Sequence, residues 1–385
     1  MNILAIEPYF GGSHRAFLES VVRHSKHHWH LAILPARHWK WRMRSAPVAL
    51  CDVIAATLSL EGQREDGRQE TVSPDVVFCS DMLDLPTWLG FASRDSRLKS
   101  WIGQVPIITY FHENQWAYPV AAKSQADYHY AFTNLLTASL SDECWFNSNH
   151  NRETFLSHAR DFLKRMPDSR AAFDLDAIDK RSCVVVPGFE AFEVDRQESL
   201  PGDPLRIGWV GRFESDKRPD RFVELLQQLE SDGVDFQLVL LGERGRRDQE
   251  HARLIEVFSH RVFVDEYAGS VAEYHNRLSM IDVVVSTADH EFFGIAMCEA
   301  IWAGAVPVVP DGLSYPEYVP DQLRYETLSE AAQLIQSLQD PAVRNTQSAT
   351  CRTRIENWTA TKLTPHLDKK VSGTILFGTE VVVRD

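Results

Sequence analysis

Short apolar runs alternate with amphipathic stretches through the first half of the chain. Residues 2–7 form an apolar run that ends at a glycine-containing turn, and residues 15–25 follow with apolar side chains at helical spacing. Further buried strands are predicted at 29–34, 75–79, 105–111, 143–147 and 183–186, and helices around 86–93 and 127–140. Strands that alternate with helices predict a parallel sheet in an α/β domain.

The same alternation restarts after residues 188–204, an acidic stretch with Gly and Pro near its end that we interpret as a linker. Strands are predicted at 205–211, 236–241, 261–264, 282–286 and 306–309, separated by helices at 219–231, 248–258, 271–279 and 293–303. Residues 355–371 have the pattern of a last helix, and the tail from Thr374 could add an edge strand. We therefore predict a first Rossmann-like domain over 1–190, a linker over 191–204, a second Rossmann-like domain over 205–357, and a helix and tail over 358–385 that pack back on the first domain.

Composition and charge narrow the class of protein. The 385 residues are 44% hydrophobic and 24% charged, which excludes disordered, collagen-like and coiled-coil chains. The net charge of −14 makes the chain a poor general binder of nucleic acid or anionic membranes, so either partner would need a local basic patch. The six cysteines form no CxxC pair, and neither a signal peptide nor an apolar stretch of about 20 residues is present. We expect a cytoplasmic protein with reduced thiols and no membrane insertion, and the oligomeric state stays open.

Two turns after predicted strands have the residues of a phosphate site. Gly11 and Gly12 lie between a strand and a helix, where a ligand can approach backbone N–H groups, although a tight turn without a ligand has the same pattern. Arg212 and Lys217 follow the first strand of the second domain, at the carboxyl edge of its sheet, where ligands bind in open α/β folds. Two cations there suit a leaving diphosphate, and the alternative is a solvated charged loop.

A pair of glutamates marks the loop and helix after the predicted strand at 282–286. Glu291 ends the loop, and Glu299 lies about two helical turns further on. Gly294 would let a ligand approach the helix N-terminus. Glu299 is surrounded in sequence by apolar residues, so it needs a partner, and we favour a functional role over an exposed helix charge.

Two segments of the first domain complete the candidate chemistry. His112, Glu113 and Asn114 follow the strand at 105–111, where they could bind sugar hydroxyls or transfer a proton, or only cap the strand. The segment at 37–44 interleaves cations with tryptophans, a composition that suits phosphate contacts with base stacking. Its alternative is a surface helix whose Trp39 and Trp41 rings pack inward. The four cations of this segment are Arg37, Lys40, Arg42 and Arg44.

These motifs carry a resemblance at two levels. Glu291 and Glu299 with seven residues between them, preceded by Arg212 and Lys217, resemble retaining GT-B glycosyltransferases of family 4, most clearly over 205–310. The segments IEPYFGGSH, LPARHWKWRMR, YFHENQWAYP and WFNSNHNRETFL resemble the tRNA-queuosine α-mannosyltransferase family over most of residues 1–165. The resemblance implies an α/β GT-B fold, with two Rossmann-like domains that face each other across a cleft.

The resemblance also implies an activity, the transfer of mannose from GDP-mannose to the cyclopentenediol of queuosine in tRNA(Asp). Gly12, Arg212 and Lys217 would hold the diphosphate, and Glu299 would bind the ribose hydroxyls. Gly11 is a further donor-binding residue. The mannose would lie against Glu291, Phe293, Gly294 and Ile295, and His112 would face the reacting sugar. His112, Glu291, Arg212 and Lys217 would be catalytic. Apart from the resemblance, the local charge leads us to expect acceptor binding at Arg37, Lys40, Arg42 and Arg44, with Glu113 and Asn114 as further candidates.

Metal and cofactor chemistry are not expected. No DxD motif follows a strand of the first domain and no His/Asp cluster has metal-ligand spacing, so cations and helix N-termini would meet the diphosphate charge. The alternatives to a tRNA enzyme are a family 4 glycosyltransferase with a lipid or glycan acceptor, and a non-catalytic nucleotide-sugar-binding module.

Overall fold

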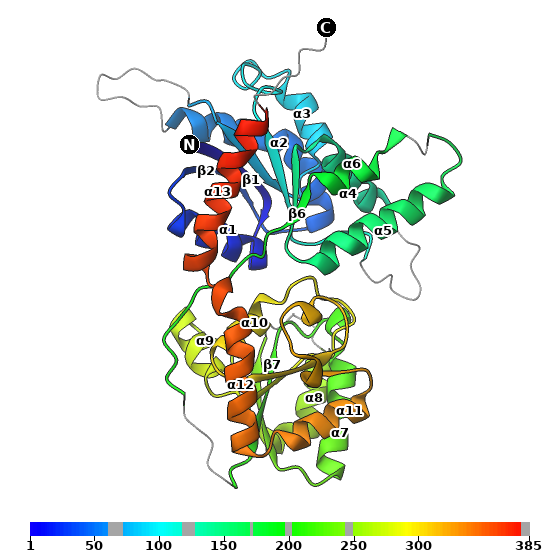
Figure 1. Cartoon of the computed structure of the whole chain (residues 1–385), viewed down its shortest axis with the longest axis vertical. Coiled ribbons are helices and arrows are strands. Elements are labelled where there is room, and N and C mark those ends of the chain that lie inside the picture. Colours follow the sequence, from blue (N-terminus) through cyan, green and yellow to red (C-terminus); the bar gives the residue numbers. More distant parts are fainter. Residues whose placement is uncertain (61–71, 118–127, 170–171, 197–201, 243–248, 379–385) are drawn as a thin grey trace. The chain divides into compact units, whose positions relative to one another are not determined.

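The computed structural model describes residues 1–60, 72–117, 128–169, 172–196, 202–242 and 249–378, and the chain divides into two compact units (Figure 1). The first unit contains residues 1–187 together with the chain from Ala360 onward, and the second contains residues 188–359. Each unit is built on its own six-stranded parallel sheet, which confirms the α/β fold predicted for both halves.

The sheet of the first unit has the order β2-β1-β3-β4-β5-β6. Its strands are β1 (Asn2–Phe10), β2 (His28–Pro35), β3 (Val76–Ser80), β4 (Ile107–Phe111), β5 (Glu143–Phe146) and β6 (Ser182–Val184). The helices of this unit are α1 (Gly12–His24), α2 (Trp39–Leu60), α3 (Leu85–Ala92), α4 (Tyr128–Leu140), α5 (Asn149–Arg165), α6 (Leu175–Lys180) and α13 (Ala360–Gly378). Because parallel strands place their carboxyl ends at one edge, the residues that follow β1, β3 and β4 are brought together.

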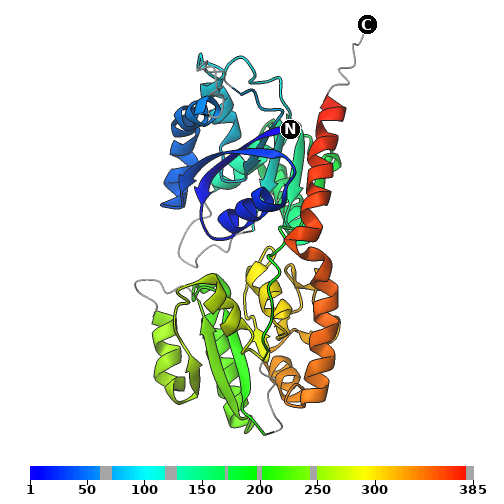
Figure 2. The same ribbon diagram turned by 90° about the vertical axis from the view of Figure 1, so that its left-hand side faces the viewer.

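Alternation along β1 divides the core of the first unit into two faces. Ile3 and Ala5 lie in one apolar cluster with residues of α1 and α13, and Leu4 and Ile6 lie in another with residues of α2 and α3. Figures 1 and 2 show α13 running beside α1, although the two helices come from opposite ends of the chain. The last helix is therefore part of the core of the first unit.

The second unit has the sheet order β12-β11-β10-β7-β8-β9. Its strands are β7 (Leu205–Val210), β8 (Phe236–Leu241), β9 (Val262–Val264), β10 (Val283–Val285), β11 (Val306–Pro310) and β12 (Arg324–Tyr325). Its helices are α7 (Pro219–Ser231), α8 (Gln249–Phe258), α9 (Val271–Leu278), α10 (Ile295–Trp302), α11 (Leu328–Ser337) and α12 (Pro341–Ile355). The central strands β7 and β10 are buried, and the loops at their carboxyl ends carry the predicted site residues.

Two sequence predictions are corrected by the structure, and one helix is longer than the segment that the sequence analysis considered. The predicted helix at 355–371 is not continuous, because α12 ends at Ile355 and α13 begins at Ala360 after a 3₁₀ turn. The predicted edge strand from Thr374 is wrong as far as Gly378, which is the end of α13, and its remainder lies outside the described residues. Helix α2 continues well beyond the segment at 37–44, through Pro47 in its interior. The proline and the basic, aromatic start of α2 hide its helical pattern.

Candidate active site

Lys217 and Glu291 form a half-buried ion pair at the carboxyl edge of the second sheet. The Lys217 Nζ lies 3.0 Å from a carboxylate oxygen of Glu291, and it also donates a hydrogen bond of 2.8 Å to the carbonyl of His290. Burial alone would raise the pKa of Glu291, but the neighbouring ammonium and its hydrogen bond hold that pKa below its usual value. Burial also opposes the charge of Lys217, and the carboxylates of Glu291 and Asp216 outweigh it, so the pKa of Lys217 is raised. Both groups are therefore charged at neutral pH.

The loop that carries Lys217 is held by its own backbone conformation and by hydrogen bonds from a second loop. Arg218, directly after Lys217, adopts a left-handed conformation with a φ of 53°, and Pro219 then starts α7. The hydroxyl of Thr287, which follows β10, donates hydrogen bonds to the carbonyls of Lys217 and Arg218. Two loops that are distant in sequence are thus joined where the ion pair forms.

Glu291 also shapes the start of α10. Its second carboxylate oxygen accepts a hydrogen bond of 3.3 Å from the N–H of Phe293. Gly294 follows with a φ of 87°, and a Cβ there would come within 2.8 Å of the Tyr318 hydroxyl. Gly294 has no side chain to cap α10, so the first N–H groups of that helix are available to an anion.

Glu299 lies on α10, and its hydrogen-bond partner lines a cavity. The Tyr274 hydroxyl donates a hydrogen bond of 3.0 Å to its carboxylate, and burial raises the pKa of Glu299 to about 7 against that hydrogen bond. Tyr274 also lines a cavity of about 440 Å³ formed by Leu241, Gly242 and residues 266–271. The partner that the sequence required for Glu299 is therefore a tyrosine at the wall of a cavity.

The side chain of Arg212 is more exposed to solvent than that of Lys217. Its side chain is about half-exposed, and Nη1 lies 3.2 Å from a carboxylate oxygen of Glu214. Its charge is still close enough to act on the pKa of Lys217. The structure thus gathers Lys217, Glu291, Phe293, Gly294 and Ile295 in two joined loops, with Arg212 at the surface of the first.

In the first unit, Gly11 and Gly12 form the turn from β1 to α1. Gly11 is extended, and a Cβ on it would overlap the side chain of Ala36. Gly12 has a φ of 53°, which disfavours other residues. Packing and backbone conformation thus require both glycines. Their contact with a diphosphate stays a prediction.

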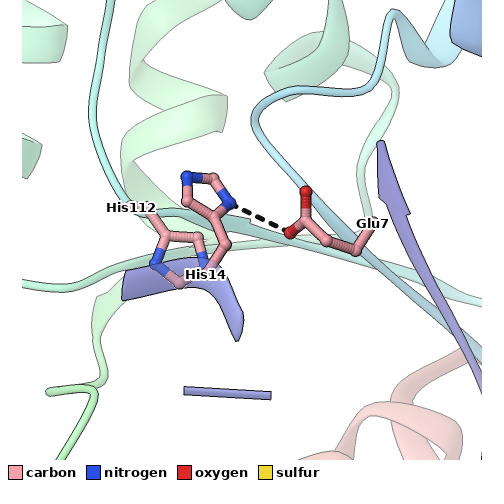
Figure 3. A group of neighbouring side chains, drawn as sticks. All are labelled: Glu7, His14 and His112. Carbon is pink, nitrogen blue, oxygen red and sulfur yellow. Dashed lines mark hydrogen bonds and ion pairs between the residues drawn. The ribbon is translucent and has the colours of Figure 1, made fainter. Parts of the chain in front are cut away.

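His112 lies in a buried cluster that the sequence analysis did not predict. Figure 3 shows Glu7 from β1, His14 from the first turn of α1 and His112 from the loop after β4 close together. His14 Nδ1 lies 3.0 Å from a Glu7 carboxylate oxygen, and the rings of His14 and His112 are 3.9 Å apart between centroids. Glu7 and His14 were present in the motif at the end of the first strand, but only the meeting of β1 and β4 at one edge joins them to His112.

One ligand atom from each of these three residues lies within 4.8 Å of the other two, close enough to share one cation. His14 Nδ1 and the Glu7 carboxylate oxygen are also at hydrogen-bond distance from each other, and the absence of a metal stays a prediction.

Glu113 and Asn114, which follow His112 in the sequence, form hydrogen bonds with nearby residues of the first unit. Asn114 is fully buried, where its amide donates to Asn151 and its oxygen accepts from the N–H groups of Trp116 and Ala117. Glu113 is half-buried and accepts a hydrogen bond from Gln115. Asn114 therefore orders the loop, and a role for either residue in acceptor binding stays a prediction.

The basic segment lies at the start of α2 and shows one aromatic ring to solvent. Trp41 is 70% exposed, which contradicts the alternative in which both tryptophan rings pack inward. Lys40 lies over the rings of Trp39 and Tyr130, and Arg44 forms an ion pair of 3.3 Å with Asp84. Arg42 donates to the carbonyl of Pro35. Arg37 and Lys40 are exposed beside Trp41.

The comparisons with known proteins agree over both units. Residues 2–189 match the family described as tRNA-queuosine alpha-mannosyltransferase N-terminal, and residues 191–335 match the family of glycosyl transferases group 1. A tRNA-queuosine alpha-mannosyltransferase of Drosophila melanogaster is 32% identical over 346 residues, which cover 85% of this chain and 84% of that protein.

Solved structures share the fold at low sequence identity. A sucrose-phosphate synthase from Thermosynechococcus elongatus has a TM-score of 0.68 and 15% identity, covering 99% of this chain and 100% of that one. HepE of Anabaena in complex with UDP has a TM-score of 0.65 and 12% identity, covering 97% of this chain and 100% of that one. These similarities confirm the predicted GT-B fold.

Two further observations concern the class of protein. Among the described residues, no helix combines the length and the apolar character that crossing a bilayer requires. All six cysteines are free thiols. With its two matched regions, its GT-B fold and its relative of similar length, the chain is a glycosyltransferase and belongs to the tRNA-queuosine alpha-mannosyltransferase family.

Proposed function

We infer that this enzyme transfers mannose from GDP-mannose to a hydroxyl of the queuosine cyclopentenediol in tRNA(Asp), with retention of the anomeric configuration. The observation that carries the proposal is the joined pair of loops around Lys217 and Glu291, with Glu299 further along the same helix. This arrangement offers separate groups for the phosphates, the sugar and the ribose of one donor. The relative in Drosophila melanogaster, by its name, mannosylates queuosine in tRNA.

In the proposed donor complex, the base lies in the cavity lined by Tyr274 and the ribose hydroxyls donate to Glu299. The diphosphate meets Lys217, Arg212 and the first N–H groups of α10, with Gly11 and Gly12 contributing backbone N–H groups. The mannose lies against Glu291 and the turn through Phe293, Gly294 and Ile295. Ammonium and guanidinium groups and a helix N-terminus meet the developing phosphate charge, and no metal is required by this proposal.

The proposed reaction takes place on one face of the sugar. The bond between mannose C1 and the β-phosphate oxygen breaks, and a bond from C1 to the acceptor oxygen forms on the same face. The proton of the acceptor hydroxyl passes to the departing phosphate oxygen of GDP, so atoms and charge balance. Lys217 and Arg212 stabilise the GDP that leaves, and His112 contacts the hydroxyls of the reacting sugar.

The proposed tRNA contact is the exposed start of α2. Arg37 and Lys40 supply phosphate contacts, and Trp41 supplies an exposed ring for base stacking. In a chain with a net charge of −14, a polyanion needs such a local basic surface.

The test is a reaction of the purified protein with tRNA that contains queuosine, followed by mass spectrometry of the nucleosides. We expect queuosine to gain one hexose with GDP-mannose, and no gain with tRNA that lacks queuosine. Transfer from another nucleotide sugar would correct the donor. Hydrolysis or transfer only with lipid or glycan acceptors would favour the alternative acceptor class, and donor binding without transfer to any acceptor would favour a binding module.

A further inference from the structure

The Glu7, His14 and His112 cluster contains two imidazole rings in face contact inside the first unit. The ring centroids are 3.9 Å apart with 32° between the ring planes, and all three side chains are buried (Figure 3). Two imidazolium ions at this separation would repel each other strongly where water cannot screen them. At most one ring of the pair carries a proton charge at neutral pH.

Glu7 decides which ring is charged. Its carboxylate oxygen is 3.0 Å from His14 Nδ1. Burial alone would lower the pKa of His14, but the attraction of Glu7 and its hydrogen bond outweigh burial, and the carboxylates of Asp81 and Glu113 add to it, so the pKa rises to about 9. Burial and the charge of His14 together hold the pKa of His112 well below its usual value.

The surroundings of His112 hold its backbone as well. Its N–H donates 2.9 Å to Asp81 Oδ1, and its carbonyl accepts from the Asn147 amide. Phe17 and Tyr110 pack edge-on against its ring, and Tyr110 stays neutral because burial raises its pKa. Burial raises the pKa of Asp81, and the charge of His14 and the N–H of His112 act in the opposite direction. The carboxyl groups that face the two rings are therefore those of Glu7, Asp81 and the half-buried Glu113.

We propose that Glu7 and His14 are positioning residues of the transfer reaction, which keep a proton on His14 so that His112 remains neutral and fixed in orientation. A neutral imidazole offers one lone pair and one N–H, so it can accept from one sugar hydroxyl and donate to another, whereas an imidazolium only donates. The proposal rests on the proposed function in one respect, that His112 contacts the donor sugar.

The first test needs no substrate. Protein labelled with ¹⁵N in its histidine rings is titrated by NMR, and the ring nitrogens report which histidines are imidazolium. We expect one buried imidazolium that persists above pH 8 and disappears in His14→Gln and in Glu7→Gln. The matched control is Glu230→Gln, which removes the carboxylate of an exposed pair with His260 and should leave that signal unchanged. If the wild-type protein contains no histidine that is still charged above pH 8, the proposal is overturned, even if a variant fails to fold.

The second test is the pH profile of kcat/KM. Removing the charge of His14 raises the pKa of His112, so the acidic limb of Glu7→Gln should move about one unit toward higher pH. At alkaline pH, the kcat/KM of Glu7→Gln should equal that of the wild type, and its KM for tRNA should be unchanged. An equal loss at every pH would show a purely structural role and overturn the proposal, as would stoichiometric metal in the wild-type protein that is absent from Glu7→Gln. If transfer to queuosine is never observed, the proposed function fails, and the NMR titration still decides the proton site.

Discussion

The Lys217 ammonium lies 3.0 Å from a carboxylate oxygen of Glu291, a residue 74 positions further along the chain. Neither side chain is more than about a quarter exposed, so each charge depends on the other for its stabilisation. The pair leaves Lys217 charged in the absence of a ligand, and a diphosphate would meet a cation that is already in position. Pre-positioned charge of this kind costs no reorganisation during the reaction.

Loss of this ion pair should reduce the rate of mannose transfer more than it reduces the folded content of the protein. We predict that Lys217→Ala lowers kcat/KM by about 10²–10³, because one cation facing the leaving diphosphate is removed. Steady-state transfer assays and circular dichroism measure the two effects. Lys164→Ala is the control, since Lys164 forms an exposed ion pair of the same length, 3.0 Å, with Asp161. Equal activity in the two variants would remove Lys217 from the site.

Glu299→Gln should weaken nucleotide binding by about 1.5–3 kcal/mol, the cost of losing a charged acceptor for hydroxyl donors. Isothermal titration calorimetry with GDP measures the change. Glu224→Gln removes an exposed glutamate of the same unit and should bind GDP as the wild-type protein does. An unchanged affinity in Glu299→Gln would place the ribose elsewhere.

The affinity for GDP should also depend on pH through Glu299. Burial raises the pKa of this carboxyl to about 7, so the carboxylate that accepts from the ribose is present above pH 7 and is lost as the pH falls below it. We expect the Kd for GDP to rise between pH 8 and pH 6, by up to about tenfold per unit once the carboxyl is protonated. Because GDP phosphate also titrates in this range, the difference between the wild type and Glu299→Gln is the quantity to compare.

Transfer should survive chelation. Because Lys217, Arg212 and the start of α10 are proposed to meet the diphosphate charge, EDTA should leave the initial rate within about twofold of the untreated enzyme. The measurement is transfer before and after dialysis against EDTA, with metal content determined in parallel. Loss of activity that Mg²⁺ or Mn²⁺ restores would contradict the metal-free mechanism.

Binding of tRNA should depend on salt through the start of α2. Lys40→Ala should flatten the slope of log K against log salt by about one unit, since one phosphate contact is lost. Filter binding or anisotropy over a range of salt concentrations gives the slope, and GDP affinity should not change. Arg160→Ala removes a cation of α5 and is the control. Arg44 is a less suitable choice because its ion pair with Asp84 contributes to the structure.

Trp41→Ala should lower tRNA affinity without changing the salt slope. Stacking of one base on an aromatic ring contributes about 1–3 kcal/mol, and it involves no counterion release. Because Trp41 is 70% exposed, its loss leaves no cavity in the core, so the melting temperature should be unchanged. A normal tRNA affinity in both Trp41→Ala and Lys40→Ala would move the tRNA contact away from α2.

The sequence by itself determined the two parallel sheets and the loops of the second unit. Buried strands such as Val283–Val285 are short and continuously apolar, so they can be recognised from the sequence. The residues that follow a parallel strand lie at the carboxyl edge of the sheet, and this does not depend on how the helices pack. The positions of Glu291, Gly294 and Glu299 along the loop and α10 follow from local geometry for the same reason. Local pattern was insufficient for α2, where Pro47 and the basic start interrupt the helical signal.

Only the tertiary structure decided which partner each charged group has. Tyr274 reaches Glu299 from a different helix, and His14 meets both Glu7 and His112 because α1 begins where β1 and β4 end. The fully buried Asn114 likewise makes its hydrogen bonds within its loop and to Asn151 of α5, which its position after a predicted strand did not indicate. Hydrogen bonds and charge pairs act over a few ångströms, so they depend on how distant segments meet, and spacing along one chain does not contain that information.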